Sequence, residues 1–191
     1  MRDLTPEDRD ALTTPPAAQT EAGMLALLRA RHMAQTNFGV PRWVYAEHVR
    51  CLSISTEADA IALDGHAPPY EVREGGDMDY YDRDIHGFEV KVSRADWLRE
   101  NRTHDEEFPA AWKSYPWGRY CTHWWLVVPH KDIVQPGELP DGWGLLVGSK
   151  RLRAVHQAAR RPAEPMRDDV KHIVARTAIK TDRYYSDRDV A

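Results

Sequence analysis

Residues 85–97, IHGFEVKVSRADW, constrain the fold more than any other stretch, because a strand pattern there runs directly into a helix signal. Three apolar residues alternate with polar or small ones, which is the two-residue period of a strand with one apolar face. Ser93 follows at once, and with Asp96 three residues later it forms the pattern of a capping box. The stretch therefore predicts a strand over 85–92 that ends at the N-terminus of a helix over 94–102.

Glu89 and Lys91 lie two residues apart on this strand, so their side chains share one face, about 6.5 Å apart along the strand. Beside the positive end of a helix, such a carboxylate and ammonium can hold a metal ion and a phosphate. For an isolated Glu-x-Lys, however, the ordinary interpretation is an ion pair on an exposed strand face. Which of the two interpretations applies depends on the residues that the neighbouring strands bring to this pair.

The order of the predicted elements is typical of an α/β domain. We expect helices over 21–35 and from about 170 onward, strands over 43–50, 57–64, 85–92 and 122–128, a second helical piece within 104–120, and a hairpin of 143–147 with 152–156. Residues 122–128, THWWLVV, form a nearly continuous apolar run, which indicates a strand buried on both faces. A helix separates it from the strand over 85–92, so we expect these two strands to be parallel neighbours.

Two earlier strands supply further acidic residues. Strict alternation would place Trp43, Tyr45, Glu47 and Val49 on one side of the first strand. In the second, Asp59 shares a face with Ile61 and Leu63, while three alanines on the other face indicate close packing of the first helix. A carboxylate beside an otherwise apolar face needs a partner, because burying it alone is costly.

Composition limits the classes of protein that remain. Of 191 residues, 29% are charged and 42% hydrophobic, and no apolar run approaches the roughly 18 residues of a membrane span. The N-terminus lacks the apolar core of a signal peptide, so we expect a cytoplasmic protein without a membrane segment. Cys51 and Cys121 form no C-x-x-C motif, and a disulfide between them is not expected in that compartment.

Charge is unevenly distributed along the chain. The formal net charge is −4, but residues 64–110 hold 13 acidic and 6 basic side chains, whereas residues 150–191 hold 11 basic and 6 acidic ones. An acidic protein is a poor general DNA binder, which counts against a nuclease. The basic end is the one stretch large enough to offset the acidic middle, and we expect it to contact phosphates if DNA is bound.

Four stretches together resemble a known superfamily. They are ADAIALD, HGFEVKVSRADWLRE, RYCTHWWLVVP and LPDGWGLL. With the order helix, three strands, helix and buried strand, they are similar to PD-(D/E)XK nucleases, and most closely to the MmcB-like group associated with bacterial and phage DNA repair. The resemblance implies a restriction-endonuclease-like core: an α/β domain over 21–160, with a mixed central sheet flanked by helices. The remainder would be a flexible arm over 1–20 and a basic, partly helical extension over 161–191.

The resemblance also implies roles for single residues. Asp59 and Glu89 would bind Mg²⁺ or Mn²⁺, Glu47 would be a further metal ligand, and Lys91 would be the catalytic lysine. Candidate contacts with DNA phosphates are Arg94, Lys113, Lys150, Arg151 and Arg153. The implied activity is metal-dependent hydrolysis of DNA phosphodiesters in repair or recombination. The alternative is a catalytically silent DNA- or protein-binding module that keeps the fold. The sequence leaves both a monomer and a homodimer open.

The nine histidines give no recognised metal-binding spacing such as H-E-x-x-H. His123, within the buried strand, is expected to be a hydrogen-bonded core residue, and His86 could assist the site on its own strand. The acidic loop 65–84 is most simply a solvated segment, with a second metal site as the alternative.

Overall fold

The structure is a computed structural model, and it describes residues 20–34, 41–51, 56–65, 83–101 and 115–189. Most of the N-terminal arm, most of the acidic loop, most of the predicted helical piece 104–120, and Lys113 lie outside the described residues.

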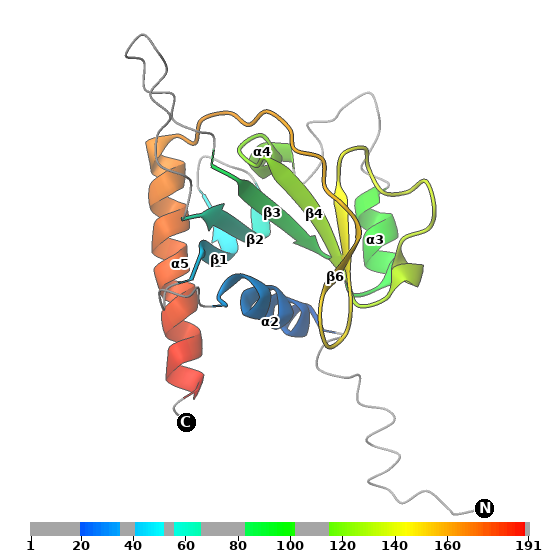
Figure 1. Cartoon of the computed structure of the whole chain (residues 1–191), viewed down its shortest axis with the longest axis horizontal. Helices are drawn as coiled ribbons and strands as arrows, with labels where there is room; N and C mark the ends of the chain where they lie inside the picture. The colour runs from blue at the N-terminus through cyan, green and yellow to red at the C-terminus, as the bar shows by residue number, and fades with distance from the viewer. Residues whose placement is uncertain (1–19, 35–40, 52–55, 66–82, 102–114, 190–191) are drawn as a thin grey trace, which may run out of the picture.

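A six-stranded mixed sheet forms the centre of the molecule (Figure 1), with the strands in the order in which they occur along the chain. The strands are β1 (Trp43–Arg50), β2 (Glu57–Asp64), β3 (Ile85–Val90), β4 (His123–Val128), β5 (Gly144–Val147) and β6 (Arg153–His156). The pairs β1–β2, β2–β3 and β5–β6 are antiparallel, whereas β3–β4 and β4–β5 are parallel. The predicted α/β class, the parallel neighbours and the hairpin are confirmed.

Helices cover both faces of the sheet. They are α2 (Glu21–His32), α3 (Arg94–Asn101), α4 (Tyr115–Gly118), the short 3₁₀ helix η3 (Lys131–Ile133) and α5 (Asp168–Asp189). The apolar side chains of α2 form one core cluster with Phe88, Trp125 and Val127 of the sheet. On the other face, Trp97 of α3, Trp117 of α4 and Val170 and Val174 of α5 form a second cluster. In Figure 1, α5 stands beside β1 and α2 lies across the sheet.

The junction of β3 and α3 has the predicted construction. The Ser93 hydroxyl accepts a hydrogen bond from the backbone N–H of Asp96 at 3.1 Å and donates one to its carboxylate at 2.7 Å. This cap fixes the start of α3 immediately after the strand. The helix then directs Trp97 into the core, where the residue is fully buried.

The alternation expected along β1 is wrong at one point. His48 has a positive φ of 52°, an uncommon conformation for a residue other than glycine. Tyr45 therefore packs in the cluster with α2, while Val49 packs in the cluster on the opposite face. On the partner strand, Ala58 packs in the cluster on the far side from α2, whereas Ala60 and Ala62 pack in the cluster with α2.

Two glycines allow the large side chains of β4 to lie flat on the neighbouring strands. A Cβ atom on Gly87 would lie 2.1 Å from the Trp124 ring, and one on Gly144 would lie 2.2 Å from the Trp125 ring. Each glycine is the register partner of the tryptophan that covers it. Both tryptophans are buried, as predicted, and the glycines supply the space for them.

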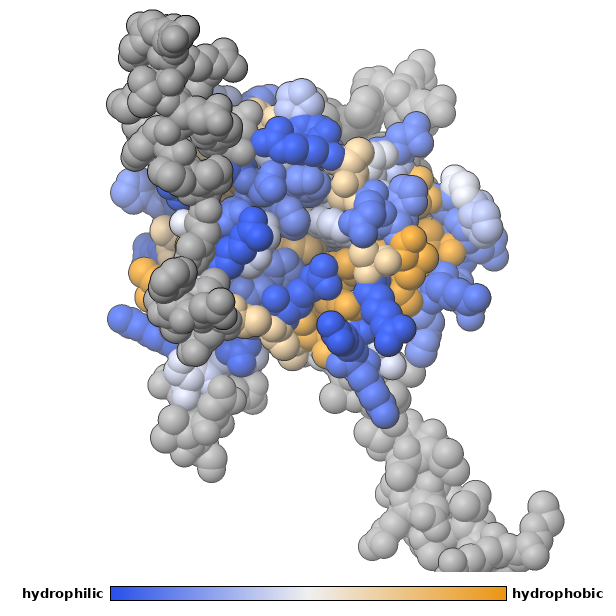
Figure 2. Space-filling model, viewed as in Figure 1, coloured by the Kyte–Doolittle hydropathy of each residue, from blue (hydrophilic) through white to orange (hydrophobic). Residues whose placement is uncertain are grey.

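Much of the surface is hydrophilic on the face that Figure 2 shows, with hydrophobic residues gathered around the region of β6. Val155 of that strand is 63% exposed. Within the described ranges, none of the helices combines the length and apolar character needed to span a bilayer. Cys51 and Cys121 are both buried thiols.

Candidate functional site

Glu89 and Lys91 lie together at the C-terminal end of β3. The Lys91 ammonium forms an ion pair with Oε1 of Glu89, and the side chains are only 12% and 4% exposed, respectively. The backbone N–H of Lys91 donates to the carbonyl of Val127 at 3.0 Å, which continues the pairing of β3 with β4 beyond Val90. The two side chains therefore share a face, as their spacing predicted, but the pair is buried rather than exposed.

Asp59 of β2 reaches the same end of β3. Its Oδ2 atom accepts a hydrogen bond from the backbone N–H of Val90 at 2.7 Å, between the two site residues of that strand. Burial raises the pKa of Asp59, and the Val90 hydrogen bond and the Lys91 charge act in the opposite direction. The structure thus places Asp59 beside the end of β3 that carries Glu89 and Lys91.

Glu47 has its hydrogen-bonding partners elsewhere. The Tyr185 hydroxyl of α5 donates to Oε2 of Glu47 at 2.8 Å, and the backbone N–H of Glu47 donates to Oγ1 of Thr181 at 3.1 Å. Burial raises the pKa of Glu47, against the hydrogen bond from Tyr185. In the part of the chain that the structure describes, Glu47, Asp59 and Glu89 do not form a group with their ligand atoms within 4.8 Å of one another.

A cleft of about 790 Å³ lies between the start of α2, the end of β1 and α5. Glu21 and His48 line it, and both act electrostatically on Asp59. The cationic side chains in its lining are Arg50, Arg176 and Lys180. Asp59, Glu89 and Lys91 are not among the lining residues, so the cleft combines two groups that act on Asp59 with cations that can contact phosphates.

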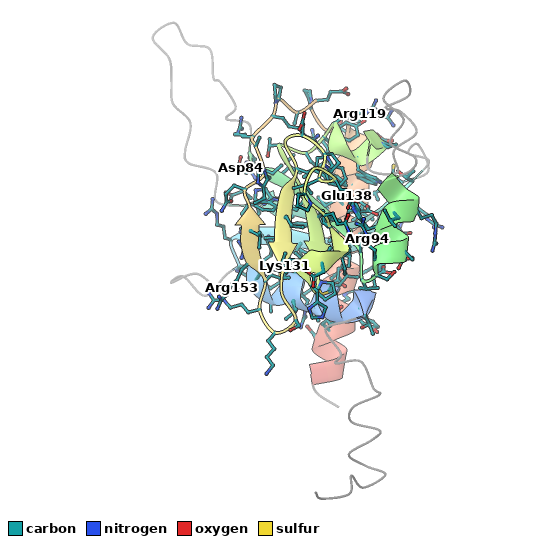
Figure 3. All side chains as sticks on the ribbon, turned by 90° about the vertical axis from the view of Figure 1, so that its right-hand side faces the viewer. Asp84, Arg94, Arg119, Lys131, Glu138 and Arg153 are labelled. Atoms are coloured by element: carbon teal, nitrogen blue, oxygen red, sulfur yellow. The ribbon has the colours of Figure 1, made fainter. Side chains whose placement is uncertain are left out.

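Arg94 is engaged in a structural contact. Figure 3 shows Arg94 and Glu138 next to each other beside α3. The guanidinium forms a two-pronged ion pair with the Glu138 carboxylate and donates to the carbonyl of Ile133 at 2.8 Å. Hydrogen bonding from Arg94 lowers the pKa of Glu138 to about 2. Arg94 thus fixes the loop after η3 to α3, and contact with DNA would require breaking this pair.

The other expected phosphate contacts lie in the hairpin. Lys150, Arg151 and Arg153 are exposed, in the turn between β5 and β6 and on β6 itself. In Figure 3, Arg153 lies well apart from Arg94, toward the other side of the view. These three residues are accessible to a polyanion but do not line the cleft between α2, the end of β1 and α5.

A second cluster of ionisable side chains was not predicted. Asp84, His86 and His123 each bring one potential metal-ligating atom within 4.8 Å of the others. Burial and the neighbouring His123 lower the pKa of His86 to about 3, and burial lowers the pKa of His123. His123 is hydrogen-bonded to Thr122, as expected, but its side chain is 15% exposed and lies beside another imidazole rather than fully in the core. Asp84 is the last residue of the acidic loop.

The sequence does contain a signal for this cluster. Asp84 and His86 have the same two-residue spacing as Glu89 and Lys91, which places both side chains on one side of the strand. What the spacing could not supply was the register that pairs His86 with His123 on the parallel neighbour. A search for histidines close together in sequence misses ligands that meet across strands.

Comparisons with known proteins add the fold alone. No family model matches the chain, and no curated protein does so either. Among solved structures, a protein of unknown function from Silicibacter pomeroyi is similar, with 18% sequence identity and a TM-score of 0.51. The similarity covers 91% of this chain and 90% of that one.

Proposed function

We propose that this chain is a metal-dependent nuclease that hydrolyses DNA phosphodiesters at Asp59, Glu89 and Lys91. One observation carries the proposal: a carboxylate from β2 and a Glu-x-Lys pair from β3 meet at one strand end. The sheet places an antiparallel β1–β2–β3 unit beside the parallel β4, an arrangement in keeping with a restriction-endonuclease-like core.

The chemistry suits these residue types. Mg²⁺ and Mn²⁺ prefer oxygen ligands and keep several waters, so Asp59 and Glu89 would hold the ion together with substrate oxygens. A bound ion supplies charge neutralisation and an activated water. The Lys91 ammonium can then leave Glu89 for the phosphate and stabilise the negative charge that develops on it.

The cleft between α2, the end of β1 and α5 supports DNA as the substrate. Arg50, Arg176 and Lys180 would contact backbone phosphates there, and such contacts are independent of base sequence. They offset the acidic character of the whole chain locally. We place the activity in DNA repair or recombination, as the resemblance implies.

Cleavage and metal binding of the same variants test the proposal. Duplex, single-stranded and branched DNAs are incubated with Mg²⁺ or Mn²⁺, and calorimetry measures metal binding. We expect Asp59→Asn and Glu89→Gln to lose cleavage and to bind the metal at least tenfold more weakly. Lys91→Ala should lose cleavage and keep metal binding, because an ammonium is not a metal ligand.

Asp64→Asn is the matched control, since Asp64 is a buried carboxylate on the same strand whose partner is Arg42. It should keep both activities. Glu47→Gln tests whether that residue is a further ligand, and its hydrogen bond to Tyr185 leads us to expect near-normal metal affinity. A wild-type protein that binds neither metal and cuts no DNA would instead support the silent binding module.

A further inference from the structure

We propose that Asp84, His86 and His123 form a second metal site, which binds a divalent transition-metal ion of the zinc type. The site does not depend on the proposed nuclease activity. It rests on two adjacent strands whose register places two imidazoles and a carboxylate side by side.

The backbone makes the cluster. His86 and His123 are register partners in the parallel pair β3–β4, and their ring centroids are 4.6 Å apart. Asp84 precedes His86 by two residues and so shares its side of the strand. All three ligating atoms lie within 4.8 Å of one another. Ligands about 2.1 Å from a tetrahedral ion are separated by about 3.4 Å, so side-chain movements of about 1 Å would complete the geometry.

Neighbouring groups hold two of the ligands in place. Oγ1 of Thr122 lies 3.0 Å from Nδ1 of His123 and hydrogen-bonds to the backbone N–H and carbonyl of Ile85 at 2.8 and 3.1 Å. The Arg160 guanidinium donates to Oδ1 of Asp84 at 3.2 Å. Such outer contacts orient the ligands of metal sites, and a carboxylate held at one oxygen still offers the other.

The surrounding charges select the kind of ion. Arg31 acts electrostatically on His86, and Arg160 and Arg161 act on His123. One carboxylate among these cations offers little to a hard ion such as Mg²⁺ or Ca²⁺, which binds through oxygen ligands and charge. Imidazole nitrogen instead suits Zn²⁺ and related transition metals.

The site also has access to open space. His86 lines a cavity of about 330 Å³, together with His32, Trp43, Phe88 and other residues of the α2 side. Sites with three protein ligands leave a fourth position for water or a small ligand. An ion at His86 would have room for such a ligand in this cavity.

Its position separates this site from the proposed nuclease site. Asp84 precedes β3, whereas Glu89 lies near the other end of the strand, about 16 Å away at the rise of an extended chain. Figure 3 likewise shows Asp84 well apart from Arg94, which begins α3 after that far end. The two sites can therefore be changed one at a time.

Two titrations of the full chain, without a polyhistidine tag, test the inference. Calorimetry measures the binding of Zn²⁺, and visible absorption measures the binding of Co²⁺. The titrations are made in excess Mg²⁺, which would occupy the proposed nuclease site, and we then expect one equivalent of Zn²⁺ or Co²⁺ to bind to the wild type. His86→Ala, His123→Gln and Asp84→Asn should each weaken Zn²⁺ binding at least tenfold and reduce the Co²⁺ absorption. His156→Ala removes an exposed histidine on β6, and Asp59→Asn alters the nuclease site; both should bind like the wild type.

Circular dichroism and thermal melting establish that each variant is folded. If His86→Ala does not fold, the variants of the partly exposed His123 and Asp84 still test the site. Absence of Zn²⁺ and Co²⁺ binding in the wild type would overturn the inference. So would binding that the three ligand variants leave unchanged. If Asp59→Asn loses cleavage but keeps the Zn²⁺ affinity of the wild type, the change affects the proposed nuclease site and leaves the second metal site intact.

Discussion

Under the proposed function, Lys91 would have two roles that compete with each other. In the metal-free protein its ammonium compensates a Glu89 carboxylate whose side chain is 4% exposed. During catalysis the same ammonium would have to serve a phosphate. Under the proposed function, a divalent ion would resolve the conflict, because it would replace the ammonium as the cation beside Glu89 and release the lysine.

The first prediction follows from this exchange. Lys91→Met should lower the free energy of unfolding of the metal-free protein by about 3–5 kcal/mol, the usual cost of removing one member of a buried ion pair. Mg²⁺ should then raise the melting temperature of the variant more than that of the wild type, since the ion supplies the missing charge. Thermal melts in the presence and absence of saturating Mg²⁺ measure both effects.

Lys171→Met is the control, because Lys171 pairs with Asp168 on the exposed surface of α5. It should melt like the wild type with and without the ion. An equal Mg²⁺ shift in Lys91→Met and wild type would show that no ion replaces the ammonium.

His32 should make the protein sensitive to mild acid. The ring is buried between Trp43, Tyr45 and Phe88, and burial lowers its pKa from 6.5 to about 4. The unfolded chain therefore takes up a proton at a higher pH than the folded one. The stability that the neutral His32 ring contributes is fully present above pH 6.5 and is lost as the pH falls toward 4. Through this residue alone, the free energy of unfolding should fall by about 2 kcal/mol between about pH 7.5 and 5.

The second prediction compares His32→Phe with the wild type by urea unfolding at both pH values. The variant keeps an aromatic ring but cannot titrate, so it should lose less stability on acidification. The absolute stability of the variant is not the readout, because its hydrogen bond to the Leu28 carbonyl is also removed. Equal losses in the two proteins would exclude His32 as the titrating group.

At the scale of elements, glycines on the two neighbouring strands make room for the tryptophan side chains of β4. Gly144 and Gly87 lie directly under the Trp125 and Trp124 rings, so a methyl group at either position would overlap a buried indole. Overpacking of this kind costs about 1–3 kcal/mol. The third prediction is that Gly144→Ala destabilises the protein by this amount in urea unfolding.

A double-mutant cycle isolates the cause. Trp125→Phe removes the indole atoms that a Cβ on Gly144 would meet, so Gly144→Ala should cost less in that background. Additive effects would instead assign the cost to the backbone nitrogen of Ala158, which lies 2.8 Å from the position of a Cβ on Gly144.

Helices and strands were predictable from the sequence where a single local residue pattern determined them. Alternation and the Ser93 cap indicated β3 and the start of α3, and the apolar run indicated β4. Alternation failed at His48, because no local pattern announces a positive φ inside a strand. The Glu89–Lys91 pair was visible from spacing alone. The cluster around Asp84 was not, because strand register depends on packing of the whole sheet.

At the scale of the whole molecule, the C-terminal helix is part of the core. Val170 and Val174 are buried with Trp117, and Thr181 and Tyr185 hydrogen-bond to Glu47 of β1. Deleting residues 167–191 would therefore expose the core and could not measure DNA contact alone. Substitution of the exposed cations on α5 separates the two effects.

The fourth prediction concerns DNA affinity. Arg176→Ala with Lys180→Ala should weaken DNA binding and reduce the slope of log affinity against log salt by about 0.9 for each phosphate that is no longer neutralised. Lys171→Ala with Arg183→Ala removes the same charge from α5 without altering the lining of the cleft. Fluorescence anisotropy over a range of salt concentrations compares the pairs. Identical slopes for the two double variants would exclude the cleft as the DNA-binding surface.

The hydrogen bond from the backbone of Glu47 to Thr181 has a consequence for synthesis in the cell. β1 is an edge strand, and α5, which lies beside it, follows every strand of the sheet in chain order. During translation β1 can pair with β2 long before α5 emerges from the ribosome, so its outer edge stays uncovered in the meantime. Nascent chains stalled before residue 168 should therefore recruit chaperones or self-associate through β1, and release of α5 should end that exposure.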